Sequence, residues 1–264
     1  MTTVSGHLAA GLPPLDAWHP PTSRPVGGHR LAYDRCGSGP GVVLLHGGAG
    51  DRTDWTDVAV RVDGTVVVPD LRGVGQSDRW PGGDVSVPAQ AASVAGLIDE
   101  LRIGPVVLAG YGIGAAVAQV VAARYPRRAA GLVITPPPVV PRRAVAGPSR
   151  EVLDRAWTHW SGPRFTPSRA RLEHLARQYD RRLLEVPQSG VEPSETITVP
   201  TIVLRPLLDP LVAASWFDHL DARFRLVTVR GLPGVGHFAP VEEPAAFVAA
   251  IHEMFEERRN QHGT

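Results

Sequence analysis

The amino-acid sequence predicts one α/β domain with a mostly parallel, eight-stranded sheet flanked by helices. Three observations lead to this fold class: short unbroken apolar runs, helical patterns between them, and glycine-rich turns directly after several of the runs. The chain has 264 residues and is 43% hydrophobic, which is enough to bury one large core.

The apolar runs are expected to be strands because most are continuous Val, Leu and Ile segments, typical of strands buried on both faces. Helical patterns such as 87–101 and 115–125 separate them, and such alternation favours parallel pairing with right-handed crossovers. The expected strands are 29–36, 41–46, 65–69, 105–110, 131–135, 201–205 and 225–230.

The chain divides into an arm, a core in two parts, and an insertion. Residues 1–25 are rich in Pro, Gly and small side chains and are expected to form an N-terminal arm. Residues 26–135 and 197–264 form the predicted core. Between them, a triple proline leads into two helical patterns, so 136–196 is predicted to be a small helical cap.

The last helix is predicted from its start signal and its apolar stripe. Pro244 opens it, and Glu242 and Glu243 lie near its positive end. One face carries the core-facing side chains Phe247, Val248, Ile251, Met254 and Phe255.

Composition excludes several classes of function. The net charge of +1 gives no reason to expect a nucleic-acid partner. All of the basic residues are arginine, so no lysine is present to form a Schiff base. Cys36 is the single cysteine, which rules out an intrachain disulfide and a cysteine-based metal cluster.

Targeting signals and cofactor motifs are also absent from the sequence pattern. The histidines lack the spacing of a helical metal site, so neither a metal nor another cofactor is expected. No secretory signal and no membrane-spanning run is visible, so the expected location is the cytoplasm. The oligomeric state cannot be deduced from this pattern.

Two glycine-rich segments follow strands in the first half of the chain. His46-Gly47-Gly48-Ala49-Gly50 has the composition of a turn whose backbone N–H groups can face a cavity. In the segment 68–78, Asp70 and Arg72 are expected to pair and fix the loop, which is a structural role.

The third segment is Gly110-Tyr111-Gly112-Ile113-Gly114, between an expected strand and a helix of small residues. A nucleophile elbow has the form G-x-S-x-G in the same context, and here glycine occupies the place of the serine. The elbow backbone is strained for a residue with a Cβ, so Gly112 relieves that strain but supplies no nucleophile. Dinucleotide binding is disfavoured because the segment lies late in the chain.

Two polar residues complete the pattern, each beyond a later strand. Asp209 follows strand 201–205, and His237 lies in Gly236-His237-Phe238 before the last helix. The order elbow, acid, histidine matches that of α/β-hydrolases, and both residues should meet at the carboxyl edge of the sheet.

Taken together, these motifs resemble the α/β-hydrolase superfamily from about residue 26 to 257. The resemblance implies that Asp209 is the triad acid, that His237 is the base, and that backbone N–H groups near Gly47 or Gly48 and at Ile113 form an oxyanion hole. The departure is Gly112, which argues against esterase, lipase and thioesterase activity through a serine.

Four functions remain open without that serine. His237 and Asp209 could transfer protons directly, giving epimerisation, isomerisation, elimination or cyclisation, as the resemblance implies for tailoring enzymes of natural-product biosynthesis. Alternatively, His237 could activate water to hydrolyse an ester, lactone or epoxide. The chain could also be a non-catalytic ligand-binding protein, or an engineered serine-to-glycine variant of a true hydrolase.

The expected partner is a small-molecule or peptide-like substrate, and no membrane partner is expected. Aromatic side chains near the motifs and in the cap are the candidates for lining its pocket. These candidates are Tyr111, Trp157, Trp160, Tyr179 and Phe238.

Overall fold

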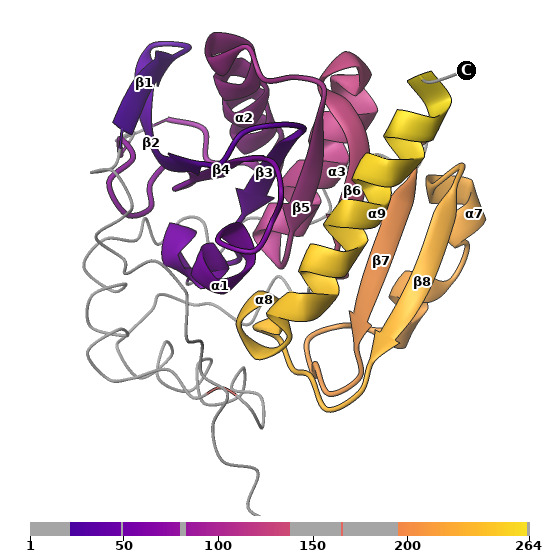
Figure 1. The fold of residues 1–264 in the computed structure, drawn as a ribbon. Helices are drawn as coiled ribbons and strands as arrows, with labels where there is room; N and C mark the ends of the chain where they lie inside the picture. Colours follow the sequence, from indigo (N-terminus) through magenta and orange to yellow (C-terminus); the bar gives the residue numbers. More distant parts are fainter. Residues whose placement is uncertain (1–21, 49, 80–82, 138–164, 166–194, 263–264) are drawn as a thin grey trace, which may run out of the picture.

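The computed structural model describes residues 22–48, 50–79, 83–137, 165 and 195–262. Its centre is an eight-stranded sheet in the order β1-β2-β4-β3-β5-β6-β7-β8, as expected in number and kind (Figure 1). β2 runs antiparallel to its neighbours β1 and β4, whereas all the other strand pairs are parallel.

The strands are short, and helices lie between most of the parallel ones. The strands are β1 (Thr22–Val26), β2 (His29–Cys36), β3 (Gly41–Leu45), β4 (Thr65–Pro69), β5 (Val106–Gly110), β6 (Ala129–Ile134), β7 (Thr201–Pro206) and β8 (Val227–Leu232). The helices are η2 (Arg52–Trp55), α1 (Thr56–Ala59), α2 (Val87–Leu101), α3 (Ile113–Arg124), η3 (Pro126–Arg128), η4 (Ala214–Phe217), α7 (Leu220–Arg223), α8 (Ala239–Glu242) and α9 (Pro244–His262).

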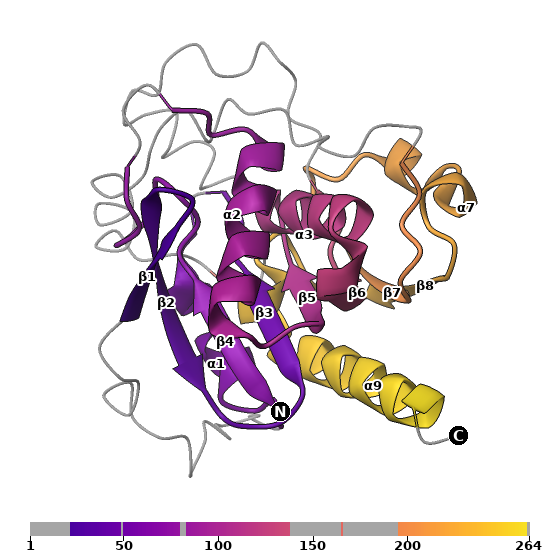
Figure 2. The same cartoon turned by 90° about the horizontal axis from the view of Figure 1, so that it is seen from above.

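The sheet separates two apolar clusters because successive strand side chains point to opposite faces. In β3, Val43 and Leu45 join the cluster under α2 and α3, while Val42 and Leu44 join the cluster under α9. Figure 2 shows α2 and α3 on one face of the sheet and α9 on the other. The expected three-layer architecture is therefore present.

The first strand is a feature that the sequence analysis missed. Residues 22–25, assigned there to the N-terminal arm, belong to β1, which pairs with β2 through Val26 and His29. Gly27 and Gly28 connect them with φ of 56° and 85°, a two-residue hairpin that needs positive φ at both positions. The predicted boundary at residue 26 therefore cuts through a strand.

Other predicted boundaries are shifted by one or two residues. α3 begins at Ile113 rather than at 115, because Gly112 is its N-cap. β8 begins at Val227 rather than at 225, since the N–H of Arg225 bonds to the carbonyl of Ile197 outside the strand pair. The predicted cap 136–196 lies almost entirely outside the described residues.

α3 packs unusually close to β3, and glycine makes that approach possible. A Cβ on Gly114 would lie 2.2 Å from the carbonyl oxygen of Leu45, and one on Gly110 would lie 2.6 Å from the carbonyl oxygen of Gly114. Both contacts are with backbone atoms, which have little freedom to move. The glycines flanking the elbow are therefore required by the packing of helix on sheet.

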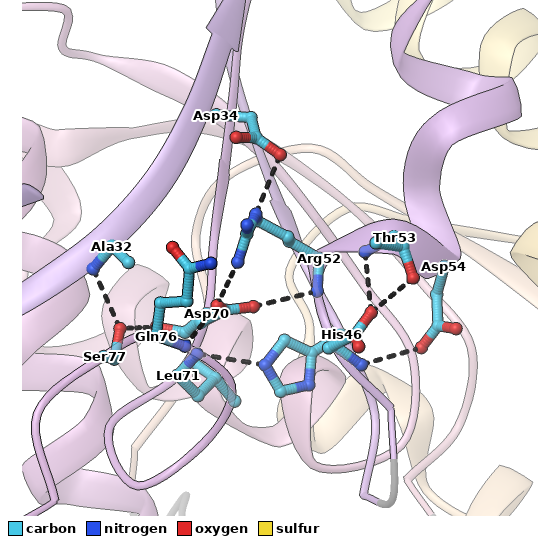
Figure 3. Close-up of polar contacts among 11 residues, drawn as sticks. Ala32, Asp34, His46, Arg52, Thr53, Asp54, Asp70, Leu71, Gln76 and Ser77 are labelled. Atoms are coloured by element: carbon cyan, nitrogen blue, oxygen red, sulfur yellow. Dashed lines mark hydrogen bonds and ion pairs between the residues drawn. The ribbon is translucent and has the colours of Figure 1, made fainter. Parts of the chain in front are cut away.

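A buried histidine joins the loops that follow β3 and β4 (Figure 3). The N–H of Leu71 donates to His46 Nε2 at 2.9 Å, so this nitrogen must be the acceptor. His46 Nδ1 then carries the proton and donates to the carbonyl of Gly47 at 2.9 Å. Burial lowers the pKa of His46, which keeps the ring neutral in this tautomer.

Asp70 is a second buried polar residue of this region; it fixes the loop as predicted, but with a partner other than the predicted one. Its side chain accepts hydrogen bonds from the N–H of Arg52 at 3.1 Å and from the N–H of Gln76 at 2.9 Å, and it forms an ion pair with the Arg52 guanidinium (Figure 3). Arg52 also bonds to Asp34 at 2.8 Å. The predicted partner was Arg72, whose guanidinium instead reaches Ser93 and the carbonyl of Asp84.

The Gly114 contact gives the first testable prediction. Gly114→Ala should reduce the free energy of unfolding by at least about 3 kcal/mol, because the new methyl group collides with a backbone carbonyl. Alanine normally stabilises a helix interior by about 1 kcal/mol, so the sign is reversed here. Gly231→Ala is the matched control, since its nearest neighbours are Leu207 side-chain atoms at 3.7 Å or more. Urea unfolding measures both, and equal stabilities would contradict the packing explanation.

The neutral state of His46 gives the second prediction. The unfolded histidine takes up a proton near pH 6.5, whereas the folded one, with its lowered pKa, does not. The free energy of unfolding should therefore fall as pH drops below about 6.5, with up to about 1.4 kcal/mol per pH unit from this residue. His46→Gln should flatten that slope, and His219→Gln, at an exposed position, should not. Urea unfolding at a series of pH values measures this dependence. If the free energy of unfolding changed equally with pH in the parent and in both variants, the explanation through His46 would be contradicted.

Candidate active site

Four sequence motifs meet at the carboxyl edge of the parallel strands. Gly47 and Gly48 follow β3, Gly112 follows β5, Asp209 follows β7 and His237 follows β8. These strands include the centre of the sheet, and ligand sites in open α/β sheets lie beyond this edge. The topology therefore brings together residues that are far apart in the sequence.

Gly112 occupies the apex of the turn between β5 and α3. Its φ is 55° and its ψ is −130°, a conformation that is strained for a residue with a Cβ, as expected at an elbow. A Cβ built there would lie 3.6 Å from His237 Nε2, 3.5 Å from the nitrogen of Gly48 and 3.2 Å from the Cα of Gly47. The position of the absent side chain is therefore bordered by the histidine on one side and the glycine loop on the other.

His237 and Asp209 form the contact that the sequence analysis expected. His237 Nδ1 lies 2.8 Å from Asp209 Oδ2, and the two side chains are 4% and 1% exposed. An ionised carboxylate can only accept, so Nδ1–H donates to Asp209. Nε2, the nitrogen nearest to the Gly112 position, is then the one left with a lone pair.

Backbone hydrogen bonds hold the Asp209 loop against the His237 loop. The N–H of Leu207 donates to the carbonyl of Leu232 at 3.2 Å, and the N–H of Leu208 donates to that of Val235 at 2.9 Å. Asp209 Oδ1 accepts from the N–H of Leu211 at 2.9 Å, which orients the carboxylate. The pairing of β7 with β8 thus continues to the residues that face each other.

The glycine loop is tied to the elbow through Tyr111. Its hydroxyl donates to Asp54 Oδ2 at 2.5 Å, and the same oxygen accepts the N–H of Asp51 at 3.2 Å. A Cβ on Gly47 would lie 2.4 Å from the Tyr111 ring, so only glycine fits against it. The N–H of Ile113 is the first in α3 and has no partner within the helix, as is usual for the first turn.

Two of the five aromatic pocket candidates lie among the described residues, and both are fully buried. Tyr111 packs edge-on against Trp55, and Phe238 lies 6.0 Å from Tyr111 and 5.6 Å from His237 between ring centroids. Phe165, from the predicted cap range, packs on Phe238 at 5.3 Å. The other candidates, Trp157, Trp160 and Tyr179, lie outside the described residues.

Three residues near the site were missed as site residues by sequence reasoning: Asp54, Phe165 and Glu242. Asp54 gave a signal, since Asp51 and Asp54 have the spacing of a capping box. Glu242 was interpreted through the last helix alone, yet its carboxylate accepts the N–H groups of Gly236 and Phe238. No local signal points to Phe165.

Metal ligands and membrane spans were searched in the same part of the chain. Within the described ranges, His, Cys, Asp and Glu side chains do not gather in groups of three or more that could hold a metal ion. No helix there has the length and apolarity needed to cross a bilayer.

Comparison with known proteins tests the family resemblance over a longer part of the chain than the motifs cover. The model of the Alpha/beta hydrolase family matches residues 42–250. An uncharacterized protein of Mycobacterium tuberculosis is 39% identical over 112 residues, 41% of this chain and 33% of that protein. The chain thus spans about a third of that relative's length. Pyrrolizixenacetamide deacetylase of Xenorhabdus hominickii is 40% identical over 105 residues, 38% of this chain and 39% of the enzyme.

The fold is also shared with a solved structure over nearly its whole length. A meta-cleavage product hydrolase from Pseudomonas fluorescens, solved as a serine-to-alanine mutant, superposes with a TM-score of 0.77 at 20% identity. The match covers 90% of this chain and 98% of that one. With the family model spanning most of the chain and the sheet order in agreement, this protein belongs to the alpha/beta hydrolase family.

Proposed function

We propose that this protein is an acid–base enzyme in which His237, oriented by Asp209, moves a proton directly on a small-molecule or peptide-like substrate. The observation that carries the proposal is the geometry at Gly112. The apex of the elbow carries no side chain, and His237 Nε2 lies 3.6 Å from where a Cβ of Gly112 would be. The base therefore lies beside the position at the elbow apex where a nucleophile's side chain would begin.

The chemistry that suits this arrangement is removal of an acidic proton beside a carbonyl group. Asp209 accepts Nδ1–H, so Nε2 can take the proton from the substrate carbon and become part of an imidazolium that the carboxylate stabilises. The electron pair of the broken C–H bond moves onto the carbonyl oxygen. The N–H groups of Gly48 and Ile113 are suited to receive that enolate oxygen.

The fate of the enolate then determines the product. If the enolate turns its other face toward Nε2 before the proton returns to the same carbon, the product is the epimer, and return of the proton to another carbon gives isomerisation. Departure of a group from the neighbouring carbon, with the proton passing from Nε2 to that group, gives elimination. Each path restores the neutral histidine and needs no cofactor, which agrees with a role as a tailoring enzyme of natural-product biosynthesis.

Hydrolysis by activated water is the second candidate, and the same position at the elbow apex, beside His237 Nε2, supports it. Absence of the serine side chain leaves room for roughly one water molecule beside Nε2. His237 could take a proton from that water as its oxygen attacks an ester, amide, lactone or epoxide. The deacetylase relative, whose name describes a hydrolysis, favours this interpretation of the site.

Deuterium exchange tests the first candidate. A panel of carbonyl compounds with acidic α-hydrogens, including β-keto esters and hydantoins, is incubated with the protein in heavy water and analysed by mass spectrometry. The protein should incorporate carbon-bound deuterium without hydrolysis. His237→Ala should reduce the rate roughly 100- to 10,000-fold, and Asp209→Asn by as much or less.

Arg259→Gln is the control, because the Arg259 side chain is exposed on the C-terminal helix and belongs to none of the site motifs. An exchange rate within a few-fold of the parent in His237→Ala would contradict direct proton transfer by this residue.

Labelled water separates the second candidate from the first. If water is the nucleophile, esters and lactones incubated in H₂¹⁸O should gain ¹⁸O in the acid product, and carbon-bound deuterium should be absent in the parallel experiment. Ligand affinity that survives His237→Ala, with neither label incorporated, would instead identify a binding protein and contradict both candidates.

A further inference from the structure

We propose that Glu242 is a positioning residue whose carboxylate holds the chain on both sides of His237 and so fixes the histidine for catalysis. The inference rests on the proposed function of His237 as the acid–base group. Its structural part concerns only the Glu242 carboxylate and two backbone N–H groups.

The carboxylate contacts the residue before His237 and the residue after it. Glu242 Oε2 accepts the N–H of Gly236 at 2.9 Å, and Oε1 accepts the N–H of Phe238 at 3.2 Å. Phe238 is the N-cap of α8, and Glu242 lies four residues later, where a side chain on the same helix face reaches back over one turn. One carboxylate therefore uses both oxygens to bracket a single residue.

Helix capping explains only half of this arrangement. The bond to the N–H of Phe238 satisfies a donor at the start of α8, as capping side chains commonly do. Gly236 precedes the helix by three residues, so its bond adds nothing to α8. The second bond instead secures the turn from which the His237 side chain projects.

The Glu242 carboxylate is buried, so it needs hydrogen-bond partners to offset the loss of water. The residue is 7% exposed, and burial raises the pKa of its carboxyl group, while the two N–H groups and nearby His237 oppose that rise. A carboxylate is costly to bury unless it is well hydrogen-bonded. Charge-assisted bonds to two N–H groups supply that compensation, and they tie the histidine backbone more firmly than a neutral acceptor could.

His237 is then held at three points. Asp209 holds the ring through Nδ1, and Glu242 holds the backbone at Gly236 and at Phe238. With these points fixed, Nε2 remains near the Gly112 position. Small displacements of a catalytic group can reduce rates about 100-fold, so loosening this bracket should be visible in turnover.

Glu242→Gln tests the proposal, with Glu256→Gln as the matched control at a 66% exposed side chain. Glutamine keeps the shape but has one acceptor oxygen, and its NH₂ group would face the second N–H. Proton exchange measured by NMR should accelerate about tenfold or more at the N–H groups of Gly236 and Phe238 and at His237 Nδ1. In the deuteration assay, kcat should fall about 10- to 100-fold while KM changes little.

Glu242→Asp is the second variant in case the first does not fold. It keeps the charge but is one methylene shorter, so it should reach at most one of the two N–H groups and show a selective loss of protection at the other. Unchanged protection of both N–H groups and of the His237 ring proton would overturn the proposal. If the parent lacks deuteration activity but Glu242→Gln still loosens the His237 ring proton, the proposed function fails and the positioning role stands.

Discussion

The close approach of α3 to β3 is the constraint on which the rest of the site depends. Because Gly110 and Gly114 carry no side chains, the helix starts directly above the sheet, and the turn at Gly112 must adopt a positive φ. This turn directs the first N–H of α3 toward the carboxyl edge. The Tyr111 ring, fixed by the same turn, then determines where the loop at Gly47 can lie. These contacts thereby set the spacing between the helix start and the glycine loop.

Local patterns in the sequence were enough to predict most strands and the long helices, because the apolar residues that mark them lie close together along the chain. Strands buried on both faces are marked by continuous apolar runs and the long helices by periodic apolar residues, and α2 agrees with its prediction to the residue. The contact of Asp209 with His237 was predicted from the order of the motifs. Three arrangements were not predicted: the pairing of Arg52 with Asp70, the bond from Tyr111 to Asp54, and the bracket that Glu242 forms around His237. Each depends on how chain segments meet in three dimensions, which periodicity does not encode.

The missed hairpin between β1 and β2 is different, because its signal was present. Gly27-Gly28 between an extended segment and a predicted strand is a recognised hairpin sequence, but the preceding prolines and polar residues hid the strand. Edge strands need only one well-buried face, so their composition is less apolar than that of central strands. β1 has this character, since only Val26 among its residues is fully buried.

In the proposed function, Gly112 is what distinguishes this site from that of a serine hydrolase. Intact-mass spectrometry after incubation with a fluorophosphonate tests this directly, because the reagent reacts with an activated hydroxyl. The parent protein should keep its mass, because the elbow apex beside His237 carries no hydroxyl group. Stoichiometric labelling of the parent would contradict the account, because it would reveal a nucleophile elsewhere.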